Sequence, residues 1–355
     1  MQAFILRGGR IFDGNGFFDG DVLIENGKIL EIGAVTQDGI PEFDVSGCIL
    51  SSGLIDIHTH IKGVSCKEFG FPIDIACIPF GVTAAVDAGG GQGDYAFLNS
   101  LCVSNAVFLP FYLKGDELDR DKIEEAVAAF KEKTLGIKVY FDRTQNPQIG
   151  LSHLRLACRF AYSKKLKVMV HCAESPNAML DIVETLGKGD ILTHSYHGGC
   201  HTIDENDYAA YKSAKKRGVI IDAGMAGGVH TDFSILKKAI ERGYVPDTIS
   251  SDVTRASAYI RGGIYGLPMC MSIMRRLGMA EKDIFKAVTN NAAYAVGRET
   301  EWLYMKLGAP ATLSVLKYGD TAIDITDRAG NRVQCDKGYV CKMTVVNGQI
   351  LYRNF

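Results

Sequence analysis

Both ends of the chain show short apolar runs separated by turn residues. An Asn-Gly pair at 26–27 lies between two such runs near the N-terminus, and a second pair at 347–348 lies between two near the C-terminus. Asn-Gly between apolar runs is a strong signal for a β-hairpin. Neither end contains a helical pattern, so we expect residues 1–51 and 309–355 to assemble into one small β-sandwich domain.

The middle of the chain, residues 52–308, has a different pattern, in which short β-rich apolar runs alternate with helical stretches. The predicted strands are 54–60, 82–87, 106–113, 136–141, 167–171, 190–194, 219–222 and 248–252. The predicted helices include 121–133, 152–164, 178–186, 207–216 and 233–242. Strands alternating with helices predict an α/β fold, and a (β/α)8 TIM barrel fits this number of strands. A doubly wound sheet is the alternative, because alternation alone does not separate the two.

Composition and charge narrow the class of protein. Hydrophobic residues make up 47% and charged residues 23%, and the net charge is -2. No basic stripe occurs, so we expect neither a nucleic-acid partner nor an anionic membrane surface. No signal peptide or membrane span is recognisable, and the 10 cysteines are scattered without a Cys-x-x-Cys pair. These features favour a cytoplasmic protein with reduced cysteines.

Polar residues recur at the ends of the predicted strands. His58, Lys138, His171, His194 and Asp252 each lie at or near the carboxyl end of an apolar run. Barrel enzymes keep their catalytic groups at this end of the strands. The pattern therefore predicts one functional site at the mouth of the barrel.

The first predicted strand ends in His58-Thr59-His60. Side chains at positions i and i+2 of a strand point to the same face, so the two imidazoles would lie side by side. Such a pair suits a borderline metal such as zinc. Two unrelated polar residues at a strand end are the alternative interpretation.

Lys138 lies inside the apolar strand 136–141. A lysine is rarely buried without a partner. Its neutral amine can react with carbon dioxide to give a carbamate, an anion able to bridge two cations. A snorkelling lysine or a structural ion pair is the alternative, but the neighbouring histidine-bearing strands favour the carbamate.

His171 and His194 end two consecutive predicted strands, so we interpret them as ligands of a second ion. Asp252 would complete the set as a carboxylate ligand. There it would also act as the general base and later as the proton donor. The alternative for Asp252 is an N-cap of a following helix.

The ordered set His58, His60, Lys138, His171, His194 and Asp252 resembles the binuclear amidohydrolase superfamily. This superfamily includes dihydroorotases, hydantoinases, allantoinases and N-acyl deacetylases. Segments 53–60, 81–89, 136–139 and 246–252 are similar to its dihydroorotase-like deacetylase branch. The resemblance implies two zinc ions bridged by a carboxylated Lys138. It also implies that one ion is held by His58, His60 and Asp252, and the other by His171 and His194.

The chain departs from that branch at positions expected to contact substrate. Tyr140 stands where the branch often has an arginine, and Met225 stands where a histidine often follows Asp-x-Gly. His230 lies nearby and could take the place of that histidine, and His197 follows His194 closely. We therefore predict Tyr140, His197, Met225 and His230 as substrate contacts.

These residues predict a metal-dependent hydrolase that cleaves an amide or ester bond of a small molecule. A hydroxide between the ions would attack the carbonyl, and Asp252 would move the proton. The resemblance favours an N-acyl or O-acyl deacetylase. The alternatives are a cyclic amidohydrolase that opens a ring and a catalytically silent binding scaffold on the same fold. Homo-oligomerisation stays open at this level.

Overall fold

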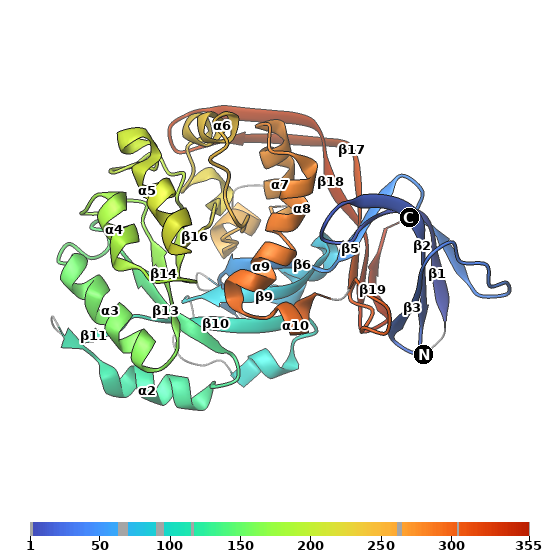
Figure 1. The fold of residues 1–355 in the computed structure, drawn as a ribbon, viewed down its shortest axis with the longest axis horizontal. Coiled ribbons are helices and arrows are strands. Elements are labelled where there is room, and N and C mark those ends of the chain that lie inside the picture. Colours follow the sequence, from blue (N-terminus) through green and yellow to red (C-terminus); the bar gives the residue numbers. More distant parts are fainter. Residues whose placement is uncertain are drawn as a thin grey trace.

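The computed structural model describes residues 3–62, 70–89, 96–114, 117–260, 265–303 and 305–354. The chain forms an α/β unit with an adjoining β unit (Figure 1). The two chain ends both lie in the β unit. None of the helices in the described ranges combines the length and apolar character that a membrane span requires.

The β unit is a sheet built from both ends of the chain, which we call the terminal sheet. Its strand order is β19-β18-β17-β5-β1-β2-β3, with β4 paired to β1. The strands are β1 (Phe4–Phe12), β2 (Phe17–Glu25), β3 (Lys28–Gly33), β4 (Glu42–Asp44), β5 (Cys48–Ser52), β17 (Leu313–Thr326), β18 (Arg332–Val346) and β19 (Gln349–Arg353). The prediction that both ends share one β unit is confirmed, and the hydrogen bonds join the strands into one continuous sheet. The division at residues 51 and 309 remains a prediction.

The two Asn-Gly turns shape this sheet as the sequence predicted. Asn26 and Gly27 have φ of 51° and 79°, and Asn347 and Gly348 have φ of 50° and 77°. These left-handed conformations suit the tight turns of hairpins β2–β3 and β18–β19. One apolar core then covers strands from both ends. It includes Leu6, Val22, Leu50, Val315 and Val345.

The hairpin β17–β18 extends beyond the terminal sheet and passes over the barrel (Figure 1). In its outer part, Tyr339 N donates to Ser272 Oγ at 2.8 Å. At its tip, Arg328 N donates to Gly228 O at 3.1 Å. The C-terminal segment thus contacts the loops of the barrel as well as the N-terminal strands.

The α/β unit contains seven parallel strands in the order β16-β15-β14-β13-β10-β9-β6. They are β6 (Leu54–Thr59), β9 (Val82–Ala88), β10 (Ser104–Pro110), β13 (Thr134–Tyr140), β14 (Lys167–His171), β15 (Ile191–Thr193) and β16 (Ile220–Ile221). Most of their residues are buried. Burial on both faces explains why these strands are continuous apolar runs and lack alternation.

Helices follow the strands and cover the outside of the barrel (Figure 1). They are α1 (Ile73–Cys77), α2 (Arg120–Ala129), α3 (Leu151–Ser163), α4 (Met179–Thr185), α5 (Glu205–Arg217), α6 (Phe233–Glu241), α7 (Leu267–Arg276), α8 (Glu281–Ala287), α9 (Asn290–Val296) and α10 (Glu299–Trp302). Shorter turns are η1 (Ile78–Phe80), η2 (Ala96–Ser100), η3 (Ala226–Gly228) and η4 (Ala256–Ile260). Two-stranded pairs, β7 (Ile61–Lys62) with β8 (Phe71–Pro72) and β11 (Leu113–Lys114) with β12 (Glu117–Leu118), lie outside the barrel sheet.

The eighth segment closes the barrel without forming a regular strand. Isolated parallel bridges join Asp222 to Thr248 and Thr59 to Val253, so the segment pairs with both edges of the seven-stranded sheet. Asp252 has a φ of 50°, which interrupts an extended ladder. Asp252 N nevertheless donates to His58 O at 2.7 Å. The predicted barrel is therefore confirmed over the open doubly wound sheet.

Candidate metal centre

The strand ends bring the predicted ligands together at one end of the barrel. His58 lies on β6, Lys138 on β13 and His171 on β14. His194 directly follows β15, and Asp252 lies on the eighth segment. All five side chains are buried, and Lys138 is fully enclosed.

One group of donors surrounds Asp252. His60 Nε2 lies 2.9 Å and His58 Nε2 lies 3.4 Å from Asp252 Oδ1. Lys138 Nζ lies 3.1 Å from His58 Nε2. Donor atoms of His58, His194 and Asp252 all lie within 4.8 Å of one another. At this spacing, one cation could coordinate an atom from each of the three side chains.

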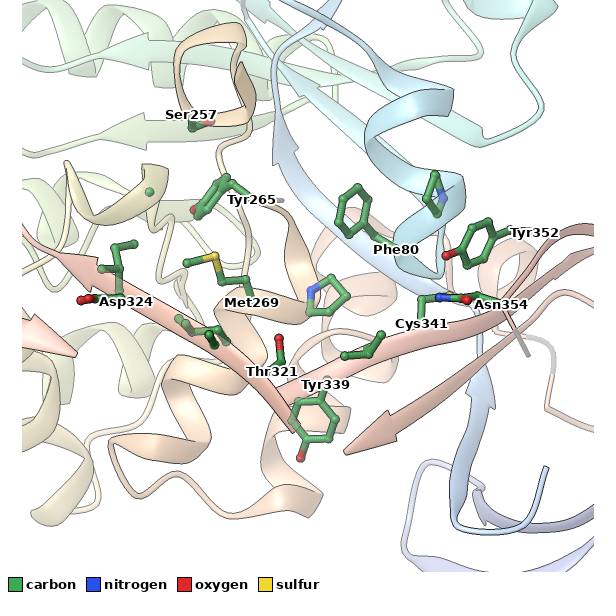
Figure 2. Close-up of a pocket in the computed structure, with 17 residues that line it drawn as sticks. Phe80, Ser257, Tyr265, Met269, Thr321, Asp324, Tyr339, Cys341, Tyr352 and Asn354 are labelled. Carbon is green, nitrogen blue, oxygen red and sulfur yellow. The ribbon is translucent and has the colours of Figure 1, made fainter. Parts of the chain in front are cut away.

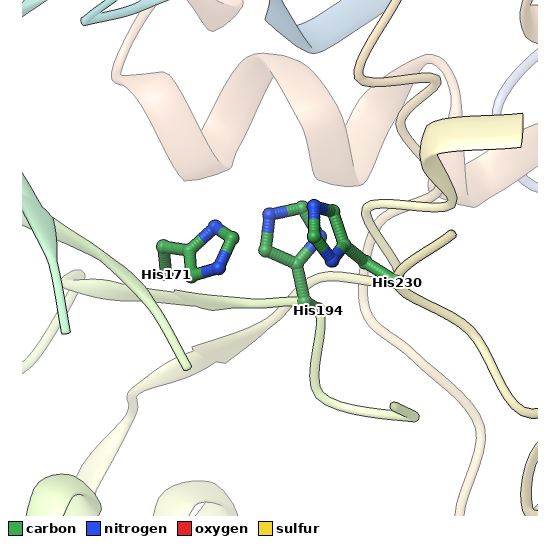
Figure 3. A group of neighbouring side chains, drawn as sticks. All are labelled: His171, His194 and His230. Carbon is green, nitrogen blue, oxygen red and sulfur yellow. The ribbon is translucent and has the colours of Figure 1, made fainter. Parts of the chain in front are cut away.

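A second group consists of His171, His194 and His230, which we call the histidine trio (Figure 3). Their ring centroids are 4.4 Å apart for His171 and His194, and 4.5 Å apart for His194 and His230. One ring nitrogen from each lies within 4.8 Å of the others. The sequence predicted two of these three as ligands and predicted His230 as a substrate contact.

Buried polar atoms in both groups lack partners, which tests whether they fit a metal. His171 Nε2, His194 Nε2 and His230 Nδ1 have no hydrogen-bond partner among the described residues. His171 Nε2 does approach Asp142 Oδ2 at 3.4 Å. An unsatisfied buried polar group costs about 1–3 kcal/mol. Divalent cations would satisfy these nitrogen donors, so the residues fit a metal centre.

Hydrogen bonds hold two imidazoles with Nε2 available as a ligand. His194 Nδ1 donates to Gly224 O at 2.6 Å. His58 Nδ1 lies 2.9 Å from Thr193 Oγ1, which itself donates to Asp222 Oδ2 at 2.7 Å. Since the Thr193 proton goes to Asp222, His58 Nδ1 must be the donor in the first contact. Such outer contacts fix the tautomer and ring orientation of metal ligands.

Two buried aspartates that the sequence did not single out support this arrangement. Asp222 also accepts from Thr248 Oγ1 at 2.8 Å and Ser250 Oγ at 2.7 Å. Asp56 accepts from the side chain and backbone of Ser251, and burial raises its pKa to about 7. Both pin the eighth segment to the neighbouring strand ends. Their sequence signal was the same as for the ligands, an aspartate at or near a strand end.

Burial governs the charge state of the cluster. It lowers the pKa of His58 to about 4 and of His230 to about 3, and it lowers the pKa of His194 well below its ordinary value. It also lowers the pKa of Lys138 to about 8. Burial opposes ionisation of Asp252, but His58 and His60 hold the pKa of its carboxyl below the ordinary value. The imidazoles of His58, His194 and His230 are therefore neutral near pH 7, as ligands must be.

The other predicted substrate contacts lie in different surroundings. The Tyr140 ring is 5.6 Å from that of His171, and its hydroxyl donates to Ala88 O at 3.4 Å. His197 is buried, with Nδ1 accepting from Gly199 N at 3.0 Å. Met225 is fully buried in the apolar core. Their roles toward substrate remain predictions.

Two of the predicted ligands have left-handed backbone conformations. His194 has a φ of 64° and Asp252 has a φ of 50°. Non-glycine residues in this region cost roughly 1–3 kcal/mol and concentrate at functional sites. His194 directly follows β15 and Asp252 lies on the eighth segment, and both side chains lie in the cluster.

A separate cavity of about 550 Å³ lies beneath the hairpin β17–β18. Phe80, Tyr265, Met269 and Tyr339 are among its lining residues (Figure 2). None of the predicted metal ligands lines it. The metal centre is therefore distinct from this cavity.

Comparison with known proteins gave matches in sequence and in structure, although no family model matches the chain. A deacetylase of Brucella anthropi is 26% identical over 336 residues, covering 88% of this chain and 82% of the relative. A deacetylase of Agrobacterium fabrum is 26% identical over 332 residues, covering 87% and 80%. A dihydroorotase structure has a TM-score of 0.88 at 23% identity and covers 99% of each chain. An adenine deaminase structure has a TM-score of 0.86 at 21% identity and covers 100% of each chain.

The barrel and its cluster of buried imidazoles are typical of a metal-dependent hydrolase. The chain is similar to curated deacetylases over most of its length, and it shares its fold with a dihydroorotase. The resemblance drawn from the sequence is thus confirmed.

Proposed function

We propose that the protein is a deacetylase that removes an acyl group from nitrogen or oxygen of a small molecule, using two divalent ions. The observation that carries the proposal is the convergence of six side chains from five segments of the barrel: His58, His60, Lys138, His171, His194 and Asp252. The curated relatives named deacetylases support the reaction class. The donor set of imidazole nitrogens and carboxylate oxygen favours zinc.

Lys138 is proposed to carry the bridging carbamate. Its enclosed amine has a pKa of about 8, lowered by burial, so a fraction is neutral at physiological pH. The nitrogen lone pair attacks carbon dioxide, a C–N bond forms, and a proton is released to solvent. The product is an anion on a side chain that already lies 3.1 Å from His58 Nε2.

Asp252 is proposed as the proton shuttle. Divalent ions in such a centre polarise a carbonyl oxygen and lower the pKa of water. With its pKa lowered, Asp252 is ionised near pH 7, so it can accept a proton from the attacking water. It then delivers this proton to the leaving nitrogen or oxygen as the bond to the acyl carbon breaks.

The first test is metal content. Protein prepared with zinc and bicarbonate should hold close to two ions per chain. Lys138→Ala should lose at least one, because no bridging anion remains. Lys138→Ala that keeps both ions would remove the carbamate from the proposal.

The second test is a hydrolysis screen with the zinc-loaded protein. N-acylated amino acids and O-acylated hydroxy acids should be cleaved, and cyclic amides such as hydantoins should not. The curated relatives named deacetylases favour this outcome. Ring opening without acyl hydrolysis would replace the proposal with a cyclic amidohydrolase.

A further inference from the structure

The histidine trio has the composition of a complete metal site. We propose that His230 is itself a metal ligand, so that the ion next to His171 and His194 is bound by three imidazoles. This inference rests on the proposed metal-dependent function. It changes the role predicted for His230 from substrate contact to ligand.

The spacing of the three rings supports a shared ion. Nitrogens in a tetrahedral zinc site lie roughly 3.3 Å apart, given bond lengths of about 2.0–2.1 Å. One nitrogen from each ring of the trio already lies within 4.8 Å of the others. Small side-chain rotations would close the remaining gap. Three histidines with an open fourth position form a familiar catalytic zinc site.

The immediate surroundings of His230 favour a ligand role. Its Nδ1 is buried and has no hydrogen-bond partner among the described residues. Its ring faces those of His194 at 4.5 Å and His171 at 4.8 Å (Figure 3). His230 therefore presents a buried ring nitrogen close to those of the other two histidines.

The loop that carries His230 is held in place before any ion binds. Ala226, Gly227 and Gly228 have φ of 48°, 63° and 84°, a run of left-handed residues. Ala226 N donates to Ser251 O at 3.0 Å, which ties the loop to the segment that carries Asp252. Gly228 O accepts from Arg328 N at 3.1 Å. A Cβ at Gly228 would lie 3.2 Å from Thr326 O, so the hairpin tip packs tightly here.

A three-imidazole site makes a prediction that a two-histidine site does not. With His171 and His194 alone, the ion depends on the Lys138 carbamate as its third protein ligand. With His230 added, three ligands remain after Lys138 is removed. His230→Ala should therefore weaken this ion and spare the other ion, because His58, His60 and Asp252 give that one three protein ligands of its own.

The experiment compares zinc content and affinity in the full-length chain. The variants are His230→Ala, Lys138→Ala and the double variant, with His153→Ala on α3 as the matched control. Zinc per chain is measured after dialysis, and affinity is measured by competition with a chromophoric chelator. Circular dichroism checks that each variant is folded.

The expected results are two ions for the wild type and His153→Ala, and one for Lys138→Ala and for the double variant, because His58, His60 and Asp252 still hold an ion there. In His230→Ala, the affinity for one ion should fall more than about 100-fold. Loss of a mere outer partner already costs about 10–100-fold. The absorption spectrum of cobalt-substituted His230→Ala should also differ from wild type, whereas that of His197→Ala should not.

Wild-type zinc affinity in His230→Ala, with only a higher KM, would overturn the inference and return His230 to substrate binding. The proposed hydrolase would stand in that case, because two ions would still be bound. A wild-type chain that binds no zinc would contradict both proposals.

Discussion

The terminal sheet and the barrel handle charged side chains differently. In the terminal sheet, charged side chains stay near solvent and some form ion pairs, as in Arg7 with Asp21 and Arg332 with Asp324. In the barrel, both Lys138 and His194 are fully buried. Among the described residues, every buried side-chain nitrogen or oxygen without a hydrogen-bond partner lies in the α/β unit, and none lies in the terminal sheet.

This difference shows where stability and function are placed in the molecule. Each unsatisfied buried group costs about 1–3 kcal/mol, so the unpartnered imidazole nitrogens at the barrel mouth lower the stability of the metal-free chain. The terminal sheet has an apolar core of its own, to which both chain ends contribute. Changes in the two regions should therefore separate activity and metal binding from stability.

The largest effect is expected for Asp252→Asn. Proton transfer by a positioned side chain contributes about 10²–10⁴ in rate, and asparagine cannot accept the proton from water. The variant should fold, keep most of its metal and lose nearly all turnover. The measurement pairs metal analysis with hydrolysis of the best acyl substrate.

A near wild-type rate for Asp252→Asn would leave Asp252 as a metal ligand without a role in proton transfer. His197 and His230 would then be the next candidates for the proton shuttle.

The next prediction compares two fully buried leucines. Leu50 lies in the core of the terminal sheet, and Leu192 lies on β15 two residues before His194. Replacement of either by alanine should cost about 2–5 kcal/mol of unfolding free energy. Only Leu192→Ala should also weaken zinc binding, because a cavity there loosens the strand that positions Thr193 and His194. Equal zinc affinity in the two variants would mean that the metal centre does not depend on packing beneath it.

The sequence predicted the parts of this structure that depend on local pattern. The hairpin turns follow from Asn-Gly, because left-handed conformations are required there. The convergence of His58, Lys138, His171 and His194 follows from the topology of a barrel, since its parallel strands end at one face. The order of apolar runs was therefore enough to find the fold and the candidate centre.

Features that depend on contacts distant in sequence could not be predicted in this way. The place of His230 in the histidine trio depends on a loop with left-handed backbone conformations and on its contact with the tip of the hairpin β17–β18. Thr193 Oγ1 connects Asp222 to His58 through two hydrogen bonds, and the spacing of these residues in the sequence does not predict this connection. The eighth segment was predicted as a strand, but it closes the barrel through isolated bridges because Asp252 leaves the extended conformation.

The next prediction, of moderate size, concerns how the barrel and the terminal sheet contribute to the pH dependence of stability. Burial lowers the pKa of His197 to about 3, so it stays neutral in the folded protein while the unfolded chain takes up a proton below about pH 6.5. The unfolding free energy of the metal-free protein should then decrease as the pH is lowered below about 6.5. The decrease should be about 1 kcal/mol per pH unit for each such histidine. Asp21 and Asp44 of the terminal sheet have lowered pKa values and lose their contribution only in more acid solution, below about pH 4.

Urea unfolding at pH 7.5 and pH 5.5 measures this dependence, and His197→Gln is the matched variant because glutamine does not titrate. The variant should reduce the slope by about one proton. An unchanged slope would mean that His197 is protonated in the folded chain as well.

The smallest effect is expected for Arg332→Ala on the hairpin β17–β18. Arg332 pairs with Asp324, and the two side chains are 59% and 49% exposed. Exposed ion pairs contribute about 0–1 kcal/mol, because water and salt screen the charges and two long side chains must be ordered. The variant should therefore unfold within about 1 kcal/mol of wild type, and the difference should shrink further in 1 M salt. Zinc content should not change, because neither side chain contacts the loop that carries His230. A larger loss of stability, or any loss of zinc, would mean that the charges on the outer part of the hairpin stabilise the barrel mouth. The ion pairs of the terminal sheet and the buried cluster of the barrel would then not be independent.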